Sequence, residues 1–174
     1  RVRAAQEFLK DGYTDGETEY EMGNTYVVWL QGESDGDAGT SAAAYTETLD
    51  RIVGGFKNDI GAEQFFVIPI GGYNDSDGAV RAQAIRDAQT LYCEDSDDAT
   101  VISRQLFDLY TYGYMKDAFH YTQEGYNIVG EDAGANMAYF VKNHEKPACR
   151  AFFDQSDEEV VKDNGAWQEE NGKV

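Results

Sequence analysis

Short apolar runs that alternate with amphipathic helical windows constrain the fold of this chain more than any other feature of its sequence. Three runs rich in β-branched and aromatic residues predict buried strands near residues 26–31, 65–70 and 100–106. A window with its apolar side chains on one helical face follows each run and predicts helices near residues 41–56, 79–93 and 122–141. Because the strands are apolar throughout rather than alternating, we expect a mostly parallel sheet with helices on both faces, a three-layer α/β/α sandwich.

The two ends of the chain depart from this alternation. A short helix is expected first, and the Gly-, Asp- and Glu-rich residues 11–23 predict a loop. After Asn143 the sequence is mostly polar, and its strong apolar anchors are Phe152, Phe153 and Trp167. We therefore predict one domain over residues 1–143 and a polar extension over residues 144–174.

Acidic residues dominate the charge of the chain. Its 174 residues include 33 Asp plus Glu against 14 Lys plus Arg, a formal net charge of -19. A surface this negative repels phosphate backbones and anionic headgroups, which disfavours nucleic-acid and membrane partners. No apolar run approaches the roughly 18 residues of a membrane span. Strong acidity keeps a protein soluble in high salt, and we predict an extracellular or secreted setting.

The scarcity of histidine limits any mechanism that needs an imidazole. His144 lies in the polar segment after the last predicted helix, where a solvated side chain is expected. His120 lies between the third predicted strand and the third predicted helix, where parallel α/β folds place catalytic loops. Asp117, three residues earlier, can reach Nδ1 and leave Nε2 facing a substrate. Taken alone, such a pair is more typical of a satisfied surface turn.

A second group of polar residues follows the first predicted strand. Gln31, Gly32 and Glu33 come directly after the apolar run. A side-chain amide can donate to a developing oxyanion, a carboxylate can orient a histidine, and glycine permits close backbone approach. Composition alone favours a polar loop in which Glu33 caps or pairs locally.

The two segments together resemble a known family. They read WLQGESDG and, about ninety residues later, DAFHYTQEGY. This pair is similar to the W-x-Q-G-E-[SA]-[DN] and D-x-x-H-x-[TS]-x-x-G motifs of SGNH hydrolases. The branch concerned is that of the carbohydrate esterases, which contains acetylxylan esterases and sialate O-acetylesterases. The resemblance covers roughly residues 26–141, and the second motif is matched by Asp117, His120, Thr122 and Gly125.

The resemblance implies an SGNH or flavodoxin-like fold and removal of acetyl groups from a carbohydrate through an acyl-enzyme, with no cofactor. It makes His120 the general base and Asp117 the residue that orients it. Glu33 corresponds to a carboxylate that is also tied to the histidine in some members. Gln31 corresponds to a residue that helps line the oxyanion hole, and Gly32 permits its approach.

The nucleophile is where this sequence departs from the family pattern. The family's serine lies in a G-Q-S-N type motif after the first strand, and nothing between Arg1 and Gly23 resembles it. We therefore expect that the natural protein is longer, or that a separate chain supplies this strand near the middle of the sheet. Within the chain, residues 32–36 fit the G-x-S-x-G elbow and make Ser34 an alternative nucleophile. The residues GDAGT before the predicted helix, and the lack of an HGGG-like loop, favour a structural Ser34.

Other chemistries have weaker support in the sequence. Residues 75–78 resemble a calcium loop but lack its first and closing ligands, and two Cys with two distant His make no zinc set. Cys93 and Cys149 are compatible with one disulfide or with two inert thiols. The alternative to an esterase is a noncatalytic carbohydrate-binding or structural domain of the same fold, in which some of the 12 tyrosines stack on sugars.

Overall fold

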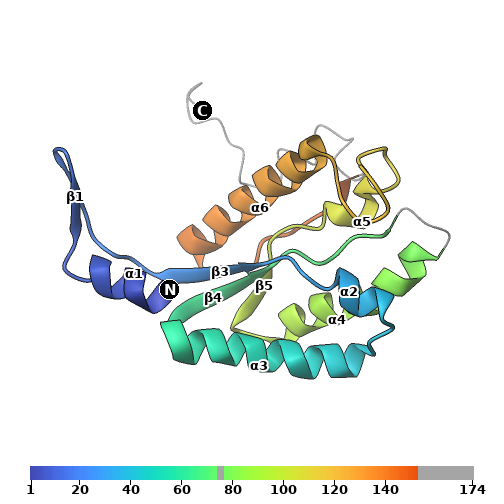
Figure 1. Ribbon diagram of the computed structural model, residues 1–174, viewed down its shortest axis with the longest axis horizontal. Helices are drawn as coiled ribbons and strands as arrows, with labels where there is room; N and C mark the ends of the chain where they lie inside the picture. The colour runs from blue at the N-terminus through green and yellow to red at the C-terminus, as the bar shows by residue number, and fades with distance from the viewer. Residues whose placement is uncertain (74–76, 153–174) are drawn as a thin grey trace.

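A three-stranded parallel sheet lies at the centre of the computed structural model, which describes residues 1–73 and 77–152 (Figure 1). Its strands are β3 (Thr25–Trp29), β4 (Ala62–Val67) and β5 (Ala99–Val101), and they lie side by side in that order. Val27 is in register with Phe65, and Phe66 is in register with Thr100. Because all strands are parallel, their carboxyl ends meet at one edge of the sheet.

Helices cover both faces of this sheet. On one face lie α3 (Ala42–Ile60) and α4 (Gly78–Asp95), whose apolar side chains form one core cluster with Phe65 and Val67. On the other face lie α5 (Leu106–Leu109) and α6 (Gln123–Asn143), which pack with Phe66. Figure 1 shows α6 above the sheet and α3 and α4 below it. The α/β/α sandwich expected from the sequence is confirmed.

Local signals set the ends of the long helices. The Ser41 hydroxyl accepts a hydrogen bond from the backbone N–H of Ala44 at the start of α3, and Gly61, with φ 64°, ends that helix. Thr122 caps α6 in the same way through the N–H of Gly125. His144 ends α6 in the left-handed region at φ 56°, and its side chain is exposed, as the sequence predicted.

Parts of the secondary structure differ from the sequence predictions. Residues 11–23 are not a loop, because they form a hairpin of β1 (Tyr13–Asp15) and β2 (Thr18–Tyr20), which follows helix α1 (Val2–Leu9). Gly16 supplies the positive φ, 62°, that this tight turn requires. The strand predicted to reach residue 106 ends at Val101, because Leu106 and Leu109 bury their side chains from helix α5.

The first strand of the parallel sheet was predicted to be buried, and this is wrong. Within the described residues, β3 pairs on one side only, with β4, so it lies at an edge of the sheet. Val28 is 53% exposed and Leu30, just after the strand, is 38% exposed. By contrast, Phe66 and Val67 of β4 are fully buried.

The described part of the C-terminal extension, residues 144–152, packs on the domain. Lys146 Nζ donates to three backbone carbonyls at the end of α4, among them that of Cys93 at 2.6 Å. The ring of Phe152 contacts those of Tyr112 and Tyr114. Phe153 and Trp167, also predicted to be anchors, lie outside the described residues, as do residues 75 and 76 of the calcium-like segment.

The two cysteines are free thiols. Cys93 is buried, and Cys149 Sγ donates to the Val101 carbonyl at 3.3 Å. Burial raises the pKa of each thiol to about 12, so neither is a ready nucleophile. In the described part of the chain, no helix is long and apolar enough to cross a membrane.

Candidate active site

Three loops lie near the carboxyl ends of the strands. The loop after β3 leads into helix α2 (Glu33–Asp37), a second loop follows β4, and the third precedes α6. Residues of α2, of the third loop and of the start of α6 line an open pocket of about 490 Å³. The pocket is lined by Glu33, Ser34, Asp37, Phe119, His120 and Tyr126. Of the sequence-predicted residues, His120, Glu33 and Ser34 therefore share one pocket, and Asp117 lies directly behind His120.

Asp117 holds the imidazole of His120 by its Nδ1 atom. Both carboxylate oxygens lie 2.9 Å from Nδ1. Oδ1 also accepts the backbone N–H groups of Phe119 at 2.9 Å and His120 at 2.8 Å. These two backbone hydrogen bonds, together with the one from the imidazole, lower the pKa of Asp117 to about 2. The carboxylate is thus ionised, so Nδ1 carries the proton and Nε2 is the basic atom.

The loop that carries His120 is fixed by its own backbone and by one buried side chain. Met115 and Tyr121 form an antiparallel bridge, and the N–H of Lys116 donates to the His120 carbonyl at 2.8 Å. Tyr121 is buried, and its hydroxyl lies 3.4 Å from the carbonyls of Gly72 and Leu106. The imidazole is therefore presented from a rigid turn, although its side chain is 68% exposed.

The remaining residues of the second motif support this turn. The Thr122 hydroxyl accepts the N–H of Gly125 at 3.2 Å and starts α6 immediately after His120. A Cβ atom on Gly125 would lie 3.2 Å from Cβ of Tyr114, so glycine lets the helix approach the loop closely. The spacing of the D-x-x-H-x-T-x-x-G motif thus has a structural reason at each fixed position.

Gly32 has a packing role that the sequence did not reveal. Its φ is 142°, and a Cβ atom there would lie 2.8 Å from Ile85 Cγ2 and 3.2 Å from Gln89 Nε2. The glycine therefore lets the loop lie directly on α4. Close approach to a ligand was the reason predicted for Gly32, and a part in an oxyanion hole stays a prediction.

Helix α2 changes one argument about Ser34. The sequence predicted an irregular segment after the G-x-S-x-G match, but a short helix begins at Glu33, directly after Gly32. The N–H of Gly36 donates to the Gly32 carbonyl at 2.9 Å and starts this turn. Strand, glycine and helix thus follow one another as in a nucleophile elbow. Ser34 is exposed, and among the described contacts no hydrogen bond joins it to His120.

Gln31 does not share the pocket of His120. Its Nε2 donates to Asp35 Oδ2 at 2.9 Å, and its backbone carbonyl accepts from Tyr45 and Gln89. The side chain lines a separate pocket of about 220 Å³, which Trp29 and residues of α3 also line. The amide is thus engaged in holding the loop, and its predicted part in the oxyanion hole has no support from this position.

Sequence reasoning missed Tyr73 and Phe119. Their rings lie 5.2 Å apart between centroids, and the Tyr73 hydroxyl donates to the Glu33 carbonyl at 2.6 Å. Burial, followed by the charge of Glu33, raises the pKa of Tyr73 to about 12, so it stays a neutral donor. Tyr73, in the loop after β4, thus contacts both other loops. In the sequence, its position after Gly71 and Gly72 at the end of a predicted strand was the one feature that pointed to a site residue.

A parallel sheet between two helical layers is consistent with an SGNH-like α/β/α fold, and an aspartate-oriented histidine lies beside the carboxyl ends of its strands. Residues 17–139, well over half of the chain, match the family model described as carbohydrate esterase, sialic acid-specific acetylesterase. The chain therefore belongs to this family. Comparison with curated proteins and with solved structures gave no significant match.

Proposed function

We propose that this protein is a serine O-acetylesterase that removes acetyl groups from a carbohydrate through an acyl-enzyme. Its family is one of carbohydrate esterases, and the observation that carries the finer proposal is the clamp of Asp117 on His120 Nδ1. That clamp leaves Nε2 as a base at an open pocket. A polysaccharide substrate fits the extracellular setting predicted from the acidity of the chain.

The chemistry follows from this arrangement. Nε2 of His120 takes the proton of a serine hydroxyl as the serine oxygen attacks the acetyl carbonyl. When the tetrahedral intermediate collapses, the bond between the acetyl carbon and the sugar oxygen breaks, and Nε2 returns the proton to the sugar oxygen. The acetyl group stays on the serine as the acyl-enzyme. A water molecule, deprotonated by the same nitrogen, then releases acetate and restores the serine. Asp117 stabilises the imidazolium in both halves of the reaction.

We propose that the serine is carried by a further strand that pairs with β3. The outer edge of β3 is unpaired among the described residues, and its apolar side chain Val28 is exposed. A parallel strand added there ends at the same edge of the sheet as Gln31 and Glu33, beside the pocket. The imidazole of His120 is exposed enough for Nε2 to accept a hydrogen bond from a serine hydroxyl on such a strand.

Hydrolysis of p-nitrophenyl acetate tests where the nucleophile lies. Residues 1–174 alone should hydrolyse it no faster than buffer, whereas a longer natural protein that contains a G-x-S-N strand should turn it over. A fluorophosphonate should label the added serine and leave Ser34 unmodified, with Ser34→Ala as the matched control. Turnover by residues 1–174, or covalent labelling at Ser34, would overturn the external nucleophile. An extended protein that neither turns over nor labels would favour the noncatalytic alternative.

His120→Ala tests the base in the complete protein. Without Nε2 the deacetylation rate should fall by about 10⁴-fold or more with the fold intact, because the serine has no proton acceptor. Asp117→Asn should cost less, since the imidazole itself remains. The control is His144→Asn, which changes the other histidine at a left-handed position that Asn tolerates. Wild-type rates in the His120 variant would refute the assignment.

A further inference from the structure

The N-terminal helix and hairpin carry an exposed aromatic surface that the esterase site does not use. No residue of α1 is buried, and Phe8 is 72% exposed. On the hairpin, Tyr13 is 45% and Tyr20 is 52% exposed. Figure 1 shows the hairpin projecting away from the sheet. Since folding normally covers large apolar side chains, this gathering at one end of the molecule points to an interaction site.

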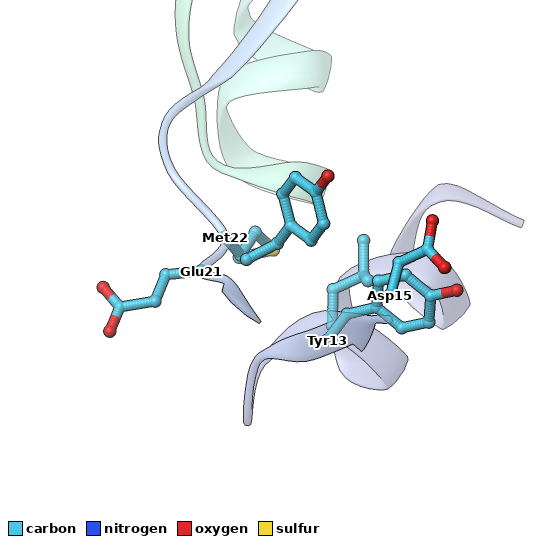
Figure 2. A pocket seen from close by; sticks show the side chains of 6 residues that line it. Tyr13, Asp15, Glu21 and Met22 are labelled. Atoms are coloured by element: carbon cyan, nitrogen blue, oxygen red, sulfur yellow. The ribbon is translucent and has the colours of Figure 1, made fainter. Parts of the chain in front are cut away.

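The end of α1 and the hairpin enclose a groove of about 330 Å³, here called the hairpin groove. It is lined by Leu9, Tyr13, Asp15, Tyr20, Glu21 and Met22. Figure 2 shows Tyr13 and Asp15 on one side of it and Glu21 and Met22 on the other. Tyr13 and Tyr20 are direct cross-strand partners, with ring centroids 6.3 Å apart and planes at 30°. The hairpin register thus sets two tyrosine rings together at the groove.

The hairpin groove is separate from the pocket of His120. The hairpin precedes the amino end of β3, whereas the loops of the candidate active site gather at the carboxyl ends of the strands. The matched family span begins at residue 17, so α1 and β1 precede it. The esterase chemistry therefore gives no reason for this groove.

We propose that the hairpin groove binds a neutral pyranose ring of a polysaccharide. The C–H faces of a sugar stack on tyrosine rings, and the carboxylate of Asp15, on the same side of the groove as Tyr13, can accept hydrogen bonds from its hydroxyl groups. Among the residues that the structure describes, no Lys, Arg or His lines the groove, and its charged lining residues are Asp15 and Glu21, so an anionic sugar would find no counter-charge there. The volume lies at the small end of small-molecule sites, which suits one or two rings.

The choice of a carbohydrate rests on the proposed esterase function. A second contact with the same polymer raises the local concentration of acetyl groups at the active site without any change in the site itself. A second copy of this chain is a poorer occupant, because it would bring Asp15 and Glu21 against their own copies in a molecule of net charge -19.

Binding of xylohexaose and cellohexaose, which are neutral and carry no acetyl groups, tests the proposal on residues 1–174. We expect saturable binding of at least one of them by calorimetry, with chemical-shift changes at Tyr13 and Tyr20 in NMR spectra. Tyr13→Ala and Tyr20→Ala should each weaken binding at least tenfold, whereas the Phe variants, which keep the ring, should retain it. Tyr112→Ala is the matched control, because Tyr112 is also 52% exposed but lies elsewhere.

Four outcomes would overturn the hairpin groove as a neutral-sugar site. They are no binding of either oligosaccharide, equal binding in the Tyr13 and Tyr20 variants, tighter binding of anionic polygalacturonate, and concentration-dependent dimerisation that both variants abolish. The esterase proposal is tested independently of the groove. His120→Ala should leave oligosaccharide binding unchanged, and loss of groove binding should leave hydrolysis of p-nitrophenyl acetate by the complete protein unchanged.

Discussion

Strands β3 and β4 are neighbours in one sheet, yet their surroundings are opposite. β4 pairs on both sides and lies between two helical layers, so Phe66 is fully buried. Among residues 1–73 and 77–152, β3 pairs on one side only, and Val28 is more than half exposed. The interior strand shows where the fold is complete in itself. The edge strand is where we propose that a further strand pairs.

The same contrast divides the candidate active site. The loop of His120 is fixed through Tyr121, which is buried in the cluster on the α6 face and reaches the segment after β4. The loop of Glu33 and Ser34 starts from the edge strand. The proposed base therefore lies on a loop held by the interior of the sheet, and the proposed nucleophile lies beside the edge strand. Each prediction below tests this division.

The largest expected effect is on stability, from Phe66→Ala compared with Val28→Ala. Phe66 packs against the rings of Tyr26 and Phe140 at 5.6 and 5.3 Å, so its removal should cost about 3–5 kcal/mol of unfolding free energy. Val28→Ala should change it by less than about 0.5 kcal/mol, because the side chain is exposed. Urea unfolding followed by far-UV circular dichroism measures both. A cost above about 2 kcal/mol for Val28→Ala would show that β3 is covered in solution.

Gly71→Ala should have the next largest effect. A Cβ atom at residue 71 would lie 2.1 Å from the Tyr121 hydroxyl and 2.3 Å from the Leu106 carbonyl oxygen, and the second of these is backbone. Such overpacking should cost about 2–3 kcal/mol and displace the turn that carries His120. Gly130→Ala is the control, because it lies in α6 with no atom near its Cβ position and should stabilise by up to about 1 kcal/mol.

If Gly71→Ala leaves the free energy of unfolding unchanged, the segment after β4 is packed less tightly against Tyr121 than the structure shows. Urea unfolding of both variants, followed by far-UV circular dichroism as for Phe66→Ala, supplies this comparison. NMR chemical shifts of the amides of residues 115–121 report on the turn itself. A displaced Tyr121 should change them in Gly71→Ala and not in Gly130→Ala.

The sequence pattern was sufficient for the elements with long apolar periodicity. The strands and helices of the sandwich followed from it, with shifts of a few residues at their ends. The sequence pattern did not predict elements that are short or that depend on contacts between residues distant in the sequence. Residues 33–37 have no apolar stripe, so α2 was not predicted, and Leu106 and Leu109 fit a helical turn as well as a strand. The Asp15–Gly16 turn signal of the hairpin was present but was not used.

The candidate site divides in the same way. Asp117 and His120 are three residues apart, so their contact is local and could be expected from spacing; the structure forms it. The direction of Gln31 depends on its hydrogen bond with Asp35 and on the packing against α3. The contact of Tyr73 with Phe119 joins segments far apart in sequence. Single-sequence reasoning has no access to such contacts.

The smallest expected effect is the titration of Asp117, which tests the rigidity of the His120 turn. The backbone N–H groups of Phe119 and His120 lower its pKa to about 2 in the folded protein, below the ordinary value of 3.8. A lowered pKa means that the turn is stabilised above pH 3.8 and loses that stabilisation as the pH falls through about 2. In NMR spectra, the transition of the Phe119 and His120 amide signals that follows the Asp117 carboxylate should therefore have its midpoint near pH 2. Asp117→Asn should show no such transition, and a midpoint near 4 in the unaltered protein would mean that the two backbone hydrogen bonds do not hold the carboxylate.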